Sequence, residues 1–215
     1  MTKFREKYHY TSHLSGQLKL MVEAGDKVRY TEVHKQIEHY SAAYKDVKNK
    51  VGPLSAAASF QMFIQEAVEK TLASPGAEIT CKKGCNHCCH LHVDISDDEA
   101  KLILDYSEKE NITIDWPRLQ KQKGREIEQW EELTKEDRAC VFLNNEGACN
   151  IYPVRPNACR KAMVISNPDN CDTIKNPGGK VTWVTSMPAE IVTSAISNTT
   201  KSGTMSDMLF QTINK

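Results

Sequence analysis

The sequence lacks a net charge and lacks any long apolar run. Its 215 residues hold 28 Lys and Arg against 28 Asp and Glu, so the formal charge at pH 7 is zero. A balanced chain offers no broad basic surface, and we therefore expect no nucleic acid and no membrane among its partners. Polar side chains interrupt every apolar segment before it reaches the roughly 18 residues that a membrane-spanning helix needs.

The N-terminal residues also lack the pattern of a secretory signal. They carry charges, but no apolar run of about 7 to 15 residues follows them. We therefore expect a cytoplasmic protein. In that reducing compartment, clustered cysteines are typical of metal sites or redox thiols rather than of structural disulfides.

Several enzyme signatures are missing as well. The sequence has no glycine-rich loop after a predicted strand for a dinucleotide or S-adenosylmethionine, no phosphate-binding loop and no H-E-x-x-H pair. The pair Gly178-Gly179 is more typical of a turn. The sequence thus identifies no catalytic residue, and whether the protein is an enzyme stays open.

The first 80 residues contain no cysteine and show helical periodicity. Apolar side chains between residues 33 and 51 recur every three or four positions, which predicts one buried helix face. Gly52-Pro53 ends this pattern, and a second apolar face follows until Ser74-Pro75-Gly76. We expect an antiparallel helical hairpin here. An earlier helix is predicted around Leu14, Leu18 and Met21.

Further helices are predicted downstream. Ser96 and Glu99 form a capping box, which marks a helix start. Residues 117–138 mix charges of both signs around a few apolar positions, a pattern that predicts one solvated amphipathic helix. Pro188 is expected to begin a helix near the C-terminus.

Segments 140–143 and 149–152 predict two short strands joined by a turn. A pairing of Leu143 with Ala148 would place the thiols of Cys140 and Cys149 on the same face of the hairpin.

A second hairpin is predicted from segments 173–175 and 181–184. Between the two hairpins, Pro156 is expected at the first position of a short helix. Cys159 would then lie in its opening turn, where the helix dipole favours a thiolate.

The strongest chemical signal is the run Cys81-Lys-Lys-Gly-Cys85-Asn-His-Cys88-Cys89. Four thiolates so close together repel one another, and a zinc ion or an iron–sulfur cluster cancels most of that charge. Gly84 can adopt the backbone angles that wrapping a metal requires. Adjacent Cys88 and Cys89 cannot easily point at one ion, so one of them serves a second ion, bridges, or stays a free thiol.

The cysteine spacing leaves the metal open. Paired short knuckles are typical of structural zinc, whereas three close cysteines and a distant fourth recur in iron–sulfur proteins. The spacing of Cys81, Cys85 and Cys88, C-x3-C-x2-C, also resembles the radical-SAM motif. The chain lacks the strand–helix alternation of the barrel that those enzymes use.

Other polar residues near the run are weaker candidates. His87, His90 and His92 can each ligate zinc, or act as donors around the ligands. Cationic side chains can offset the remaining thiolate charge; these are Lys82, Lys83, Arg155, Arg160 and Lys161.

Together with Cys140-x-Phe142-Leu143 and the segment Gly147-x-Cys149-x-Ile151-Tyr152-x2-Arg155-Pro156-x2-Cys159-Arg160, this run resembles the YkgJ-like cysteine-cluster family, described as zinc- or iron-chelating. The resemblance covers roughly residues 81–161. It implies a site for zinc or iron, including a 4Fe-4S cluster. The ligands that it implies come from Cys81, Cys85, Cys88, Cys89, Cys140, Cys149, Cys159 and Cys171.

The fold class that we predict is mainly α: a helical hairpin or bundle with an irregular, metal-organised cysteine-rich module that contains one or two short β-hairpins. The expected divisions are a helical region 1–80, a cysteine module 81–171 and a C-terminal part 172–215 that packs on the same core.

Three functions are consistent with these residues. The first is chelation of zinc or iron, with about 10 kcal/mol or more of binding free energy coupled to folding. The second is an iron–sulfur redox or protein-modifying enzyme, because the flagellin lysine methylases are similar in their cysteine region. The third is an adaptor in which the hairpin of residues 30–74 binds a protein partner and the metal only holds the shape.

Overall fold

The computed structural model describes residues 10–74, 78–82 and 84–214. The interruption expected at Pro75-Gly76, the N-terminal residues 1–9 and Lys83 lie outside this part of the chain. The described part is mainly helical, which confirms the predicted class. Its α-helices are α1 Ser12–Glu23, α2 Lys27–Val51, α3 Pro53–Leu72, α4 Asp97–Lys109, α5 Trp116–Gln122, α6 Ile127–Glu131, α7 Lys135–Arg138, α8 Asn157–Lys161, α9 Met187–Ser197 and α10 Met205–Ile213.

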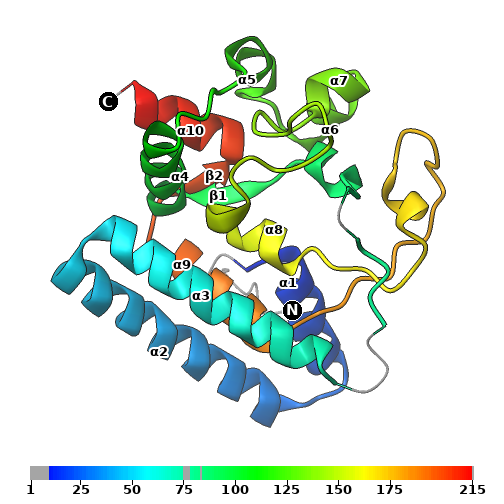
Figure 1. The fold of residues 1–215 in the computed structure, drawn as a ribbon. Coiled ribbons are helices and arrows are strands. Elements are labelled where there is room, and N and C mark those ends of the chain that lie inside the picture. The colour runs from blue at the N-terminus through cyan, green and yellow to red at the C-terminus, as the bar shows by residue number, and fades with distance from the viewer. Residues whose placement is uncertain (1–9, 75–77, 83, 215) are drawn as a thin grey trace.

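The predicted helical hairpin and the earlier helix are both confirmed. α2 ends at Val51, α3 begins at Pro53, and Gly52 alone joins them. α1 and α9 pack onto the hairpin, so that segments from both ends of the chain lie side by side (Figure 1). Apolar side chains from α2, α3 and α9 share one core; its most buried members include Tyr44, Ile64 and Val192.

A second core lies on the other side of the molecule. There β1 (Asp94–Ser96) pairs antiparallel with β2 (Ser202–Thr204), and Ile95 lies opposite Gly203. α4 and α10 pack beside this two-stranded sheet (Figure 1). α4 begins with the predicted capping box: the Ser96 hydroxyl accepts from the Glu99 amide at 3.2 Å, and the Glu99 carboxylate accepts from the Ser96 amide at 2.9 Å.

The single helix predicted over residues 117–138 is wrong. Three short helices, α5, α6 and α7, replace it. Gly124 has a φ of +70°, which no helix continues through. The apolar side chains are also drawn to different places, because Leu119 enters the second core while the Trp130 indole donates to the His90 carbonyl at 3.0 Å.

Neither predicted β-hairpin forms as a pair of strands. In the first, one isolated bridge joins Leu143 to Cys149, a register one residue away from the predicted one. The Asn144 carboxamide oxygen accepts from the amides of Glu146 and Ala148, so the turn is stabilised by its own side chain.

In the second predicted hairpin, residues 181–184 pair with residues 163–165 and not with residues 173–175. The Val184 amide donates to the Met163 carbonyl at 2.8 Å, and the Ile165 amide donates to the Thr182 carbonyl at 3.0 Å. Residues 173–175 instead form a turn on the Asp172 carboxylate, which accepts from the Lys175 amide at 3.1 Å. A local hydrogen-bond acceptor thus replaces the strand partner.

The helix expected near Pro188 is confirmed as α9, and Pro156 caps α8 one position earlier than predicted. None of the described helices combines the length and the apolar character of a membrane span.

Candidate metal centre

The cysteine run sits in an irregular loop that leads into a short 3-10 helix, η1 (His87–His90). Gly84 has a φ of +91°, as expected for a loop that wraps tightly. The Val164 amide donates to the Cys81 sulfur at 3.4 Å, and the Cys140 amide donates to the Cys89 carbonyl at 2.7 Å. The two ends of the run are therefore tied to different distant segments.

All eight cysteines are free thiols, and their mutual electrostatic interactions divide them into two sets. In the first set, the charges of Cys81 and Cys85 act on Cys171, which ends the 3-10 helix η3 (Pro168–Cys171) packed against η1. The thiols of the second set likewise act on one another; they are Cys89, Cys140, Cys149 and Cys159. Cys88 interacts with members of both sets.

Burial makes the second set difficult to ionise without a cation. It raises the pKa of the Cys140 thiol to about 12, and neighbouring thiols add to the shift. Burial also raises the pKa of Cys159 well above its ordinary value, with the charges of Cys140 and Cys88 acting in the same direction. Burial therefore opposes the thiolate that the dipole of the five-residue helix α8 favours at Cys159.

Cys88 and Cys89 behave as a donor–acceptor pair. The hydrogen bond that the Cys89 thiol donates to Cys88 lowers the pKa of Cys88 and raises the pKa of Cys89, and burial raises the pKa of Cys89 further. The positive charge of Arg155 lowers the pKa of Cys88 further. The adjacent thiols are therefore not equivalent, which agrees with the expectation that they do not serve one ion in the same way.

Two glutamines of helix α3 hold two arginines in place beside the thiols. The Arg155 guanidinium donates to the Gln65 carboxamide oxygen at 3.1 Å and lies 3.8 Å over the Tyr152 ring. The Arg160 guanidinium donates to the Gln61 carboxamide oxygen at 3.0 Å, and burial lowers the pKa of Arg160 to about 10. No sequence signal pointed to the two glutamines, because they lie almost a hundred positions before their partners.

Lys161 has a different partner from the one expected. Its ammonium group contacts the Glu190 carboxylate at 2.5 Å, and both side chains are buried. The Thr11 hydroxyl donates to the same carboxylate oxygen. The Glu190 carboxylate thus balances the positive charge of Lys161, and the pair connects α8 to α9 and to the start of α1.

The three candidate histidines differ in their contacts. The His90 ring bonds to the Asn86 carbonyl at 3.1 Å, and the His92 ring bonds to the Arg125 carbonyl at 3.1 Å. His87 Nδ1 is buried and has no hydrogen-bond partner within the described residues. It lies 3.6 Å from a carboxylate oxygen of Asp172.

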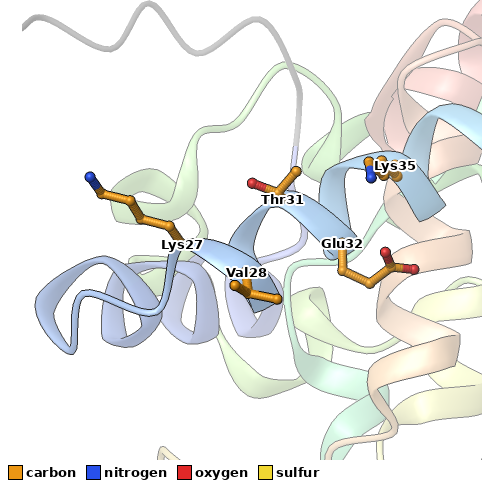
Figure 2. A pocket seen from close by; sticks show the side chains of 5 residues that line it. All are labelled: Lys27, Val28, Thr31, Glu32 and Lys35. Atoms are coloured by element: carbon orange, nitrogen blue, oxygen red, sulfur yellow. The ribbon is translucent and has the colours of Figure 1, made fainter.

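A cavity of about 1230 Å³ adjoins the thiols and reaches the Lys161–Glu190 pair and Trp183. Every cysteine except Cys171 contributes to its lining. A second hollow, of about 380 Å³, lies along one stretch of α2 (Figure 2) and is lined by Lys27, Val28, Thr31, Glu32 and Lys35. It contains no thiol or imidazole, and we assign it no chemistry.

The chemistry of the donors fits a soft metal. Thiolates select zinc, copper(I) and iron–sulfur clusters over hard cations, and a cation would offset the burial that now keeps Cys140 and Cys159 protonated. However, among the described residues no three His, Cys, Asp or Glu side chains lie close enough together to hold one metal ion. The thiols surround the cavity instead.

Comparison with known proteins agrees with this donor chemistry. Neither the curated proteins nor the solved structures contain a match to this chain. Residues 80–176 match the model of the CxxCxxCC family, described as a "putative zinc- or iron-chelating domain". This part of the chain is therefore similar to that domain, and we refer to residues 80–176 as the CxxCxxCC domain.

Proposed function

We propose that this protein chelates zinc or iron through thiolates of its CxxCxxCC domain. One observation carries the proposal: seven of the eight free thiols line one cavity, and the most buried of them have pKa values raised by desolvation. Without a cation these thiols stay protonated. Binding of a metal would release their protons and join the chain segments that carry them.

The residues that would hold the metal are the second set with Cys88. Cys140 and Cys159 approach from the turn before the Leu143 bridge and from α8, while Cys89 approaches from η1. Arg155 supplies a positive charge that favours the thiolate of Cys88 and opposes the raised pKa of Cys149. Its contact with Gln65 keeps that charge in place.

The spread of the thiols favours an iron–sulfur cluster over a single zinc ion in the second set. A zinc ion requires four sulfurs at about 2.3 Å from one point. In a cluster each thiolate binds a different iron, so that the sulfurs stand further apart. When bound, such a cluster supplies one-electron redox chemistry or a Lewis-acidic iron.

The cavity favours an enzyme as the second candidate function. It extends from the thiols to the buried Lys161–Glu190 pair, and so offers a polar wall for a small ligand next to the metal ligands. An adaptor that uses the metal only for shape would not need this space. The reaction would be a redox or protein-modifying one, as the resemblance to flagellin lysine methylases suggests.

The test is metal analysis of the full chain purified without oxygen. We would measure zinc, iron and acid-labile sulfide per chain, together with the absorption spectrum near 400 nm. Iron with matching sulfide supports a cluster, and zinc in a colourless sample supports a structural site. The variant Cys149→Ser should lose metal, whereas His90→Gln, whose ring bonds to a backbone carbonyl, should keep it. A purified chain that holds neither zinc nor iron in stoichiometric amount would refute the proposal.

A further inference from the structure

The lining of the large cavity is more positively charged than the chain as a whole. The chain has no net formal charge, yet the lining contains five cationic side chains and only two carboxylates, those of Asp94 and Glu190. The cations are those of Lys82, Arg138, Arg155, Lys161 and Lys201. A hollow lined mainly by charges of one sign raises the local concentration of ions of the opposite sign.

Only one of these cations has a carboxylate partner within the described part of the chain. Lys161 contacts Glu190, whereas Arg138 donates to the Leu133 carbonyl and Lys201 to the Gln211 carboxamide oxygen. A zinc ion held by four thiolates has a net charge of about −2. A metal site beside the cavity would therefore offset only part of the positive excess.

Arg155 is the cation best placed to hold a ligand, because it is buried in the cavity wall and its hydrogen-bond partners are neutral. It is 9% exposed. Its guanidinium donates to the Tyr152 carbonyl at 3.2 Å and to the Gln65 carboxamide oxygen at 3.1 Å. A guanidinium keeps its charge at neutral pH and has more N–H donors than these two contacts use. A buried charge of this kind gains stability from an anion.

A second buried arginine adds to the positive charge at this place. The Arg160 guanidinium donates to the same Gln65 oxygen at 3.4 Å and to the Gln61 oxygen at 3.0 Å. One carboxamide oxygen thus accepts from two like charges, and the charge of Arg155 lowers the pKa of Arg160. The contacts fix the Arg155 guanidinium before a ligand arrives, which reduces the entropy that binding would cost.

The lining also contains apolar side chains, among them Ile151, Met163 and Trp183. The volume of about 1230 Å³ gives a small organic molecule enough space. An inorganic anion alone would leave this apolar surface in contact with water. A molecule that combines an acidic group with an apolar body would cover it.

We propose that the cavity binds a small organic anion: Arg155 holds its carboxylate or phosphate group, and the apolar side chains of the lining contact the rest of the molecule. This inference names the class of small ligand for the second candidate function, and it rests on that proposal for the role of the cavity. It does not depend on which metal the thiols bind. A guanidinium recognises a carboxylate and a phosphate in the same way, by two parallel hydrogen bonds.

Calorimetric titration of the full chain, purified without oxygen, tests the ligand class. The three probes share a phenyl group: hydrocinnamate, phenyl phosphate and the neutral hydrocinnamamide. At least one anion should bind about tenfold more tightly than the amide, because only an anion forms charge-assisted hydrogen bonds with Arg155. The tighter of the two anions identifies the acidic group. Equal affinity for all three probes, or no binding of either anion, would overturn the inference.

Two variants then test the role of Arg155. Arg155→Gln should weaken binding of the anion by about tenfold or more and leave binding of the amide unchanged. Gln65→Glu gives Arg155 a carboxylate partner and should also weaken anion binding. Its matched control is Gln36→Glu on α2, because Gln36 and Gln65 each donate to a glutamate one helical turn away.

Circular dichroism and gel filtration identify any variant that has failed to fold. Unchanged anion affinity in folded Arg155→Gln would overturn the inference. If that variant does not fold, unchanged affinity in Gln65→Glu would overturn it instead.

Zinc and iron are measured in every sample, so that the two proposals are tested separately. Anion binding by a wild-type chain that holds no metal would refute chelation and support this inference. Metal in a chain that binds neither anion would have the opposite meaning. If Arg155→Gln loses its metal, the reference is wild-type protein stripped of metal. That protein should still bind the anion more tightly than the variant, and equal affinities would overturn the inference.

Discussion

The carboxylate of Asp98 shows how a single residue joins two parts of this molecule. Its side chain is fully buried, and it accepts from Lys48 at 2.6 Å, from Lys101 at 3.0 Å and from the Tyr44 hydroxyl at 3.0 Å. Burial alone would raise the pKa of Asp98, but the hydrogen bonds from the two lysines outweigh it, and the pKa is lowered. The same burial and the Asp98 charge raise the pKa of Tyr44.

Asp98→Asn should lower the free energy of unfolding by about 1–3 kcal/mol at pH 7, because Lys48 and Lys101, which are only partly buried, lose their charged hydrogen-bond acceptor. The folded-state pKa of Asp98 lies below its unfolded value of about 3.9. The stabilisation is therefore fully present above that pH and is lost as the pH falls through the folded-state pKa. Urea unfolding at pH 7 and near pH 3 would measure it. The control Asp46→Asn removes an exposed pair with Lys50 and should cost at most about 1 kcal/mol. A loss that is equal at both pH values would contradict the assignment.

Arg155→Gln should make metal release more sensitive to acid. Arg155 favours the thiolate forms of Cys88 and Cys149, so its removal raises both pKa values and lets protons compete with the metal at higher pH. We expect the pH of half-release, at a fixed chelator concentration, to rise by up to about one unit. Arg29→Gln removes an exposed arginine of α2 as the control. An unchanged midpoint in Arg155→Gln would show that this guanidinium does not act on the ligands.

At the scale of elements, the periodicity of the apolar residues predicts the long helices, but it does not predict the structure of the cysteine region. α2, α3 and α9 bury one continuous face each, and such faces are visible in a single sequence. The predictions of one helix over residues 117–138 and of a hairpin over residues 173–184 were wrong. The positive φ of Gly124 interrupts the helix, and the Asp172 carboxylate binds the backbone amides that a strand partner would have bound. Backbone angles and side-chain acceptors of this kind leave only weak sequence patterns.

The α2–α3 connection depends on one glycine. Gly52 has φ +83° and ψ 168°, a region that is almost closed to residues with a Cβ atom. Gly52→Ala should therefore destabilise the protein by about 1–3 kcal/mol, although open space surrounds the added methyl group. Gly16→Ala is the matched control, because Gly16 lies inside α1 with equally open space, and it should stabilise by up to about 1 kcal/mol. Thermal unfolding of both variants decides the matter, and a neutral Gly52→Ala would argue against this backbone conformation.

At the scale of the whole molecule, the CxxCxxCC domain depends on segments outside it. α3 provides Gln61 and Gln65 for the two arginines, and β2 pairs with β1. α9 provides Glu190 for Lys161. These contacts bury charges that the domain by itself would leave unpaired.

A fragment of residues 80–176 should therefore fail to fold cooperatively, even with zinc or iron supplied. The full chain should show one cooperative transition, whereas the fragment should show a shallow one with exposed apolar surface. Circular dichroism melts and binding of a hydrophobic dye would distinguish them. A sharp transition in the metal-loaded fragment would show that the metal replaces the lost contacts.

The sequence by itself determined the mainly helical class, the hairpin of α2 and α3, the capping box and the cysteine motif of residues 81–161. These features depend on residue type and on short spacings, which a linear sequence records directly. Only the tertiary structure decided which thiols line the cavity, that Arg155 and Arg160 contact glutamines of α3, and that His87 lies beside Asp172. Such contacts join segments tens of residues apart. Their geometry depends on how the hydrophobic clusters of the molecule pack together, and no local pattern in one sequence encodes that packing.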